Sequence, residues 1–576
     1  MKNKKVFFLY LILSIFFTQL LIAQGGYNNI SQISERLKQL NTDYSVYTDL
    51  KSLAKTPGGH DIWLLSIGSG EIKNHPAIAI VGGVDGANLL SSELAIQFAE
   101  QLLGSSNSDS IKTLLSTTTF YVFPNLNPDA SEQYFSALKY NRGSNNRQTD
   151  DDRDGRLNED PYDDLNNDGF ITLIRVKDNT GKWLSHPQDE RVMKEADNNK
   201  GEFGTYKIYS EGIDNDKDGE FNEDGEGGVI FNKSLTFNYP HFTPGAGEYP
   251  VSETETRAFL DFLFDAWNVF AVLSFGESNN LSEPLRSSQT QRTVTQGAPT
   301  TGMGRGMRTG GRIVKNILPN DALINSLVSD KYNSIIGSKA SSVISGTDGD
   351  FFQWAYFHYG RFSYSTPGWW VPAESGSRGP QGRIPGNLRA PTNRNEDSHP
   401  DIDFLKWADE NNINNAFIPW QLIEHPDFPD KEVEVGGIAP YVNKNPPFNM
   451  VSDIAEKHYK FIVSLAEMKP KIDIININTE PAGKDLTRLS IDIYNKGLFS
   501  TTTGIGERTR WVRKVKVELK TTNSQTIITG KNIQLLGNIQ SDNSEKISWL
   551  IKGKGDVKII AGAPNTGIKE VNINIK

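Results

Sequence analysis

The stretch AIAIVGGVDGANLLSSELA, residues 77–95, decides the fold of this chain. It begins with the short apolar run Ala77–Val81, which has the composition of a buried strand. A loop follows, and residues 91–103 then have the pattern of a helix. A strand that leads through a loop into a helix is the basic unit of α/β folds, so this stretch predicts a sheet with helices on its faces.

The flanking segments continue this alternation. Residues 61–67 and 119–123 are further β-type runs, and apolar residues at helical spacing predict a surface helix within 26–54. Further along, residues 252–267 have a helical pattern and 269–275 form another buried-type strand. We therefore expect one large α/β domain over residues 26–468.

The composition changes after Pro470. From Ile472 to the last residue, short β-rich runs are separated by turn residues, which is the pattern of an all-β sandwich. We expect this second domain over residues 471–576.

Composition excludes several classes of function. The chain has 576 residues and a formal net charge of −10, without a long basic block beyond its first five residues, so nucleic acid is not an expected partner. It contains no cysteine, which excludes disulfides and cysteine-ligated zinc. Any transition-metal site must use His, Asp or Glu.

The N-terminus predicts export. A basic start, an apolar run from Val6 to about Ile22 and a small residue at Ala23 are typical of a signal peptide over residues 1–23. The alternative is a permanent anchor helix, for which the apolar run is short. No other stretch is long and apolar enough to span a membrane, so we expect a secreted or periplasmic protein.

An Asp-rich insertion over residues 141–226 interrupts the α/β pattern. Three loops in it share the spacing Asp-x-Asp/Asn-x-Asp-Gly, and oxygen ligands at alternate positions suit a hard cation. Calcium is therefore the expected cofactor, and the alternative is a set of solvated acidic turns. The candidate ligands are Asp150, Asp152, Asp154, Asn158, Asp160, Asp164, Asn166, Asp168, Asp214, Asp216, Asp218, Asn222 and Asp224.

Several segments, in order, resemble the M14 metallocarboxypeptidase family. Residues 81–95 look like the strand, loop and helix that carry the family's His-x-x-Glu zinc pair, and 123–130 is similar to its Asn-Pro-Asp-Gly turn. Residues 228–233 resemble its Asp-Leu-Asn-Arg segment, and 249–258 the start of its next helix. The resemblance implies a mixed eight-stranded sheet flanked by helices and zinc-dependent removal of C-terminal residues.

The residues at the family's catalytic positions do not suit that chemistry. A zinc peptidase site needs three ligands and a carboxylate base. The zinc-equivalent positions carry Asp85, Asn88 and Gly276, of which only the first has a good ligand atom. Pro367 stands where the general base is expected, and Lys233 replaces an arginine. We therefore do not expect zinc.

The remaining cleft still offers binding groups. Asp85 and Glu277 stand at strand ends, where two carboxylates can approach each other and form a pair for hydrolysis, although solvated or capping acids are the alternative. Aromatic side chains at the expected cleft rim can stack on a ligand, although core packing is the alternative. The substrate-cleft candidates are Asn232, Lys233, Glu277, Tyr364, Trp369 and Trp370.

Three functions are consistent with these patterns. The first is a secreted, catalytically inactive homologue that binds a peptide, a cell-wall fragment or a glycan. The second is an active zinc carboxypeptidase with an atypical metal site. In the third, the β-sandwich acts as an adhesion or carbohydrate-binding module on an inert scaffold.

Overall fold

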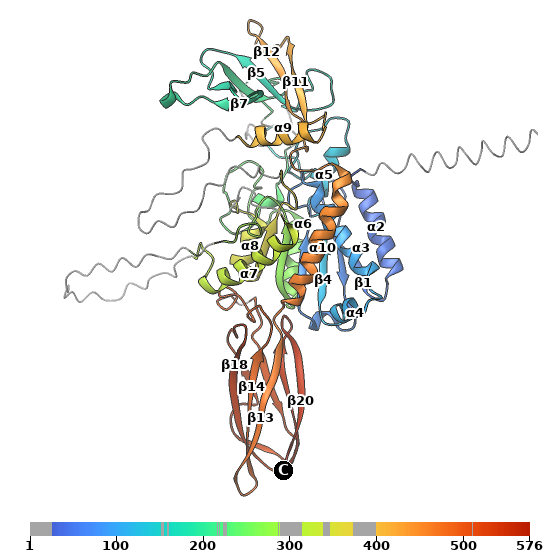
Figure 1. Cartoon of the computed structure of the whole chain (residues 1–576), viewed down its shortest axis with the longest axis vertical. Helices are drawn as coiled ribbons and strands as arrows, with labels where there is room; N and C mark the ends of the chain where they lie inside the picture. Colours follow the sequence, from blue (N-terminus) through green and yellow to red (C-terminus); the bar gives the residue numbers. More distant parts are fainter. Residues whose placement is uncertain are drawn as a thin grey trace, which may run out of the picture.

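The computed structural model describes the chain in three units that follow one another along its longest axis (Figure 1). Residues outside this description are 1–25, 151–154, 158–159, 216, 218, 220, 223–226, 286, 288–313, 338–345, 372–398 and 510. The expected signal peptide, 1–23, lies outside the described residues. Within the described ranges, no helix is long and apolar enough to cross a membrane.

The central unit contains a mixed sheet with the strand order β1-β2-β4-β3-β9-β10. Its strands are β1 (Thr48–Lys55), β2 (Asp61–Ile67), β3 (Ala77–Val81), β4 (Thr119–Phe123), β9 (Val269–Phe275) and β10 (Phe362–Thr366). The last four strands in this order are parallel, while β1 and β2 are antiparallel to their neighbours. The described chain thus has six strands in this sheet, and not the eight that the family resemblance implies.

Helices cover both faces of the central sheet. They are α2 (Ile30–Asp43), α3 (Leu89–Gly104), α4 (Asp109–Leu115), α5 (Pro128–Glu132), α6 (Thr254–Asp265), α7 (Pro319–Ile336), α8 (Phe351–Phe357) and α10 (Val451–Glu467). Ile78 and Ile80 of β3 point into one core with α3, α7 and α10, while Ala79 and Val81 point into a second core with α6 and α8. Both faces of β3 are buried, which explains its continuous apolar sequence.

A second sheet corrects the expectation that residues 141–226 are only an ion-bound loop. Its order is β11-β12-β5-β8-β6-β7, and every pair is antiparallel. The insertion supplies β5 (Leu173–Lys177), β6 (Trp183–His186), β7 (Asp189–Glu195) and β8 (Tyr206–Ser210). A much later segment supplies β11 (Phe417–Ile423) and β12 (Val433–Ile438), and α9 (Pro400–Glu410) packs below the sheet (Figure 1).

The C-terminal unit is formed by two four-stranded sheets, β13-β14-β18-β16 and β17-β15-β19-β20. The strands are β13 (Ile472–Gly483), β14 (Leu486–Asn495), β15 (Lys516–Lys520), β16 (Thr526–Thr529), β17 (Ile533–Leu535), β18 (Asn543–Lys552), β19 (Gly555–Ala563) and β20 (Gly567–Ile575). Alternate residues of both sheets, such as Ile491 and Val517, share one apolar core. This packing follows from the period-two burial of strands such as β14.

Polar contacts fix the C-terminal unit to the central one. The buried Arg361, just before β10, donates from Nη2 to the carbonyl oxygen of Trp511 at 2.8 Å. The Thr503 hydroxyl donates to the carbonyl oxygen of Gly360 at 2.9 Å. Five short 3₁₀ helices complete the described secondary structure: Ile72–Asn74, Gln133–Phe135, Asn198–Lys200, Phe231–Lys233 and Phe448–Met450.

Candidate functional site

Asp85 and Glu277 meet at the carboxyl edge of the central sheet. Asp85 follows β3 and Glu277 follows β9, and these parallel neighbours end at the same edge, where ligand sites of α/β sheets are found. The Nζ atom of Lys444 lies 3.0 Å from Asp85 Oδ2 and 2.8 Å from Glu277 Oε1. The two expected carboxylates are therefore close to each other, but a lysine ammonium bridges them.

Lys444 reaches this position from a turn that follows β12. Tyr441 adopts a left-handed conformation with φ of 69°, and its carbonyl oxygen accepts from the backbone N–H groups of Lys444 and Asn445. The Asn445 side chain then binds the loop before α3 and the first turn of this helix: it donates to Ala87 O in the loop at 2.8 Å and accepts from Leu90 N in the helix at 3.1 Å. The turn that presents the ammonium is thus fastened to the loop that presents Asp85.

The three charges differ in their exposure and in their pKa. The side chains of Asp85, Lys444 and Glu277 are 14%, 32% and 49% exposed. Burial raises the pKa of Asp85 above its usual value. Burial acts in the same direction on Glu277, but the Lys444 charge and hydrogen bond lower the pKa of Glu277. Although burial opposes it, the two carboxylates raise the pKa of Lys444, which keeps the ammonium charged at neutral pH.

The other family positions are used for internal structure. Asn88 caps α3 by accepting from Ser91 N at 3.1 Å, and it donates to the carbonyl oxygen of Pro367 at 3.3 Å. A Cβ on Gly276 would lie 2.5 Å from Cγ2 of Val84, so a side chain there requires Val84 to move. The residues present do not fit a zinc ion, and no group of three His, Asp or Glu side chains among the described residues is placed to hold a metal.

Among the aromatic cleft candidates, Tyr364 is a core residue, which corrects the expectation that it lines a rim. Tyr364 is 1% exposed in β10 and packs with Phe499 and Phe270 in the core below α3 and α10. Trp369 and Trp370 pack half-buried against the same core. Every residue of β10 is buried, so both faces of this strand are covered.

The two candidates from the Asn-Lys segment lie in the 3₁₀ helix Phe231–Lys233. Asn232 Oδ1 accepts from the backbone N–H of Phe351 at 2.9 Å and thereby holds the start of α8. Lys233 is half-buried, and its backbone lies close to Gly349. A Cβ atom added at Gly349 would lie 2.3 Å from the Lys233 carbonyl oxygen. Asn232 is therefore a structural residue.

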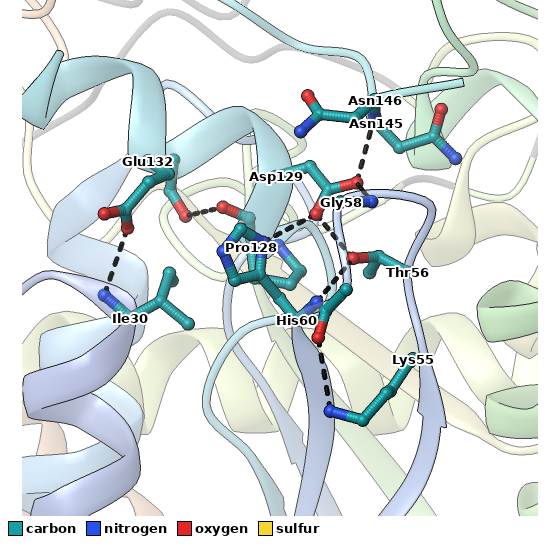
Figure 2. Close-up of polar contacts among 12 residues, drawn as sticks. Ile30, Lys55, Thr56, Gly58, His60, Pro128, Asp129, Glu132, Asn145 and Asn146 are labelled. Atoms are coloured by element: carbon teal, nitrogen blue, oxygen red, sulfur yellow. Dashed lines mark hydrogen bonds and ion pairs between the residues drawn. The ribbon is translucent and has the colours of Figure 1, made fainter. Parts of the chain in front are cut away.

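A second polar cluster, which the sequence did not predict, surrounds Asp129 at the start of α5. Figure 2 shows its carboxylate among the end of β1, the turn before β2 and the loop after α5. Asp129 accepts from Thr56 Oγ1 at 2.5 Å, from Gly58 N at 3.0 Å and from Asn146 N at 2.9 Å. His60 Nδ1 lies 2.8 Å from the same carboxylate.

These donors set the charge states in the Asp129 cluster. Burial alone would raise the pKa of Asp129, but the bonds from His60, Thr56, Asn146 and Gly58 lower it. The hydrogen bond to Asp129 raises the pKa of His60. The cluster fixes the family-like Asn-Pro-Asp turn at the same edge of the sheet as Asp85, and its residues hold one another without a further ligand.

The three Asp-rich loops share one internal contact. In each loop the first Asp accepts from the N–H of the glycine five residues later, and that glycine has positive φ. The pairs are Asp150 with Gly155 at 3.1 Å, Asp164 with Gly169 at 2.8 Å, and Asp214 with Gly219 at 3.0 Å. In the second loop, Asn166 Nδ2 also donates to Asp168 Oδ2 at 2.9 Å.

The first and third loops are joined by Asp160. Its buried carboxylate accepts from the backbone N–H groups of Asn215 at 3.0 Å and of Asn222. Among the described residues, buried Oδ1 atoms of Asp150 and Asn222 have no hydrogen-bond partner, and such oxygens fit a hard cation. The candidates Asp152, Asp154, Asn158, Asp216, Asp218 and Asp224 lie outside the described residues.

A cavity of about 910 Å³ adjoins the turn that carries Lys444. Rings from distant segments line it, including Tyr27, Tyr134 and Phe170. Amide side chains, such as Asn412 and Asn415, supply much of its polar wall. The cavity combines aromatic rings and amide groups with one lysine, Lys139, whose Nζ lies 5.8 Å from the centre of the Phe170 ring.

Comparison with known proteins assigns the central unit to a family. The zinc carboxypeptidase family model matches residues 33–367, more than half of the chain, so the chain belongs to this M14 family. A domain of unknown function, DUF8731, matches residues 471–574.

Individual relatives match over short stretches only. Carboxypeptidase E of Caenorhabditis elegans is 29% identical over 19% of this chain and 24% of its own length. A zinc carboxypeptidase of Saccharothrix mutabilis subsp. capreolus is 25% identical over 21% of this chain and 29% of its own length. This chain thus spans about a quarter of the length of these curated relatives.

Solved structures of low sequence identity are also similar to this chain. One is thrombin-activatable fibrinolysis inhibitor, with 12% identity, a TM-score of 0.34 and coverage of 59% of this chain and 68% of that one. Another is the bovine form of that protein in complex with a tick carboxypeptidase inhibitor, with 10% identity, a TM-score of 0.38 and coverage of 77% and 96%.

Proposed function

We propose that this protein is a secreted member of the zinc carboxypeptidase family that binds peptides without hydrolysing them. The observation that carries the proposal is the ammonium of Lys444 between Asp85 and Glu277, at the strand ends where the family resemblance places zinc. Hydrolysis would require a metal or another group to polarise the peptide carbonyl and an activated water. Asn88 caps α3 and Pro367 has no ionisable side chain, while the Lys444 ammonium is already bound to Asp85 and Glu277.

The cavity beside the Lys444 turn is the place where we propose that the ligand binds. Its volume of about 910 Å³ accommodates several residues of an extended peptide, and its rings and amides suit side-chain and backbone contacts. The same combination suits a glycan or a cell-wall fragment, which remains the second candidate ligand because planar amides and aromatic faces also bind sugars.

Two assays test the proposal. Peptides with free C-termini are incubated with zinc-loaded and with chelator-treated protein, and release of the terminal residue is measured by mass spectrometry. We expect no release in either sample. Zinc-dependent release that the chelator abolishes would show that the alternative, an active carboxypeptidase with an atypical site, is correct.

Ligand binding is measured with a peptide library and a glycan array. We expect Phe170→Ala and Asn415→Ala, both on the cavity wall, to weaken peptide binding at least tenfold. Phe203→Ala removes a ring that is 78% exposed and lies outside the cavity, so it should leave binding unchanged. Binding to the glycan array alone would instead favour the second candidate ligand.

The β-sandwich offers the third candidate function, adhesion or carbohydrate binding. Its edge strands β16 and β17 carry exposed apolar residues, among them Ile528 and Leu535. Replacing both with Ser in the full chain should leave peptide binding unchanged if the central unit holds the ligand. A loss of cell-surface or glycan binding in that variant would place the function in the sandwich.

We also propose that the Asp-rich loops bind calcium as a structural ion. The repeated loop contact and the two partnerless oxygens of Asp150 and Asn222 support this proposal. Chelation should lower the melting temperature and expose the second sheet to proteases, and added calcium should restore both. Unchanged melting and proteolysis after chelation would contradict calcium binding.

A further inference from the structure

We propose that Lys444 is a tethered cation that takes the place of a divalent metal, and that Asp85 and Glu277 become a divalent-cation site when its ammonium is removed. This proposal concerns the same site as the proposed function. It rests on the proposed function, in which the native protein holds no zinc at this site. Its test measures metal binding only, so it can fail while the absence of hydrolysis stands.

The distances fit a shared cation position. Both carboxylates contact one Nζ atom, at 3.0 Å and 2.8 Å, and they come from chain segments 359 and 167 residues away from Lys444. Oxygen ligands of zinc lie about 2.0–2.2 Å from the metal, so each carboxylate has to move inward by less than about 1 Å to bind an ion at this point.

The charge balance favours a cation at this position. Asp85 is largely buried, and a second carboxylate beside it is repulsive unless a positive charge lies between them. Lys444 provides one positive charge for two negative ones. A divalent ion would neutralise both, so the site without the lysine has the charge that favours such an ion.

The position of Lys444 is fixed by the fold. The Asn445 side chain bonds to Ala87 on the Asp85 loop and to Leu90 at the start of α3, and Tyr441 N donates to Asn141 Oδ1 at 2.8 Å. An exposed lysine in an ordinary surface ion pair is not held in this way. The turn therefore brings the ammonium to the two carboxylates as part of the native structure.

The other family positions limit the affinity of the opened site. Asn88 is committed to capping α3 and Gly276 has no side chain, so two carboxylates and water would complete the coordination. We therefore expect binding that is weaker than that of a three-ligand zinc site, and an open coordination position.

The experiment compares full-length wild-type protein with Lys444→Met, which keeps the length of the side chain but not its charge. Lys460→Met is the matched control, because it removes an exposed lysine that pairs with Glu456. Zinc binding is measured by equilibrium dialysis without added calcium, and any zinc held by the Asp-rich loops cancels because these loops are the same in every variant. We expect Lys444→Met to bind one more zinc per chain than wild type or Lys460→Met. Its affinity for this zinc should be at least tenfold higher than that of any zinc binding in these two proteins.

Two further variants decide the assignment. Adding Asp85→Asn and Glu277→Gln to Lys444→Met should abolish the extra zinc, and retention of that zinc would overturn the proposal. Equal zinc binding by Lys444→Met and wild type would also overturn it. If Lys444→Met does not fold alone, it is refolded with zinc; recovery of the native circular dichroism supports the proposal, and failure contradicts it.

Discussion

Two buried aspartates at one edge of the central sheet hold their charge in different ways. Asp129 is surrounded by a hydroxyl, two backbone N–H groups and His60, and its pKa is lowered. Asp85 accepts one weak backbone bond, from Ala87 N at 3.3 Å, and otherwise depends on Lys444, while burial raises its pKa.

The difference separates a structural carboxylate from one that needs a cation. Fixed donors satisfy Asp129 within the fold, so its turn needs no external partner. Asp85 has few such donors, and the Lys444 charge opposes the effect of burial on its pKa without overcoming it. Within one sheet, one strand end thus holds its carboxylate through fixed donors, and the neighbouring one holds it through an ammonium.

The largest expected effect is at Asp129. Replacing it with Ala leaves several buried donors without a partner, and we expect the free energy of unfolding to fall by about 4 kcal/mol. Urea denaturation measures this loss. Asp49→Ala, which removes an exposed partner of Lys51, is the control and should change stability by less than about 0.5 kcal/mol. A loss below about 1 kcal/mol at Asp129 would break the distinction between the two aspartates.

A smaller effect is expected at Asp85. Asp85→Asn keeps the shape of the side chain, and Lys444 retains Glu277 as its partner, so we expect a loss of about 1 kcal/mol. The same denaturation experiment measures it. Because Glu277 is about half exposed, Glu277→Gln should cost less still. A loss at Asp85 as large as that at Asp129 would show that Asp85 is equally structural.

The smallest expected effect is on titration. The folded-state pKa of His60 is raised, so its pairing with Asp129 stabilises the fold below the usual histidine pKa and is lost as pH rises through the raised value. The pKa of Asp129 is lowered, so its contribution is lost as pH falls through that lowered value. The pair is thus most stabilising at mildly acidic pH.

Nuclear magnetic resonance of the His60 ring can test this directly. In the wild-type protein the pKa of His60 should lie above the usual histidine value. In Asp129→Asn the pKa of His60 should return toward that value. His358, for comparison, bonds to Thr236 and not to Asp129, and its pKa, which burial lowers, should be the same in both proteins. An unchanged His60 titration would mean that Asp129 does not set its charge.

The sequence predicted the parts of the fold that have local signals. The run 77–81 and the helix after it lie where the strand and helix patterns indicated, because burial on both faces of β3 leaves a continuous apolar sequence. The β-rich region after Pro470 likewise forms two packed sheets. In both cases neighbouring residues carry the pattern.

The second sheet and Lys444 have no such local signal. Val176 pairs with Val433 across the chain, and the strands of the insertion are short segments between acidic loops. Lys444 lies in an Asn- and Pro-rich turn that resembles an ordinary loop. Its role depends on a contact with residues that precede it by 359 and 167 positions, which spacing alone does not predict.

The pairing of β5 with β12 also constrains the order of folding. The insertion cannot complete its sheet until the chain up to Ile438 has left the ribosome, since β11 and β12 form one edge of that sheet. Lys444 follows β12 by six residues. During synthesis, closure of the second sheet and arrival of the ammonium at Asp85 are therefore linked late events, and until then the two acidic strand ends lack the lysine that bridges them.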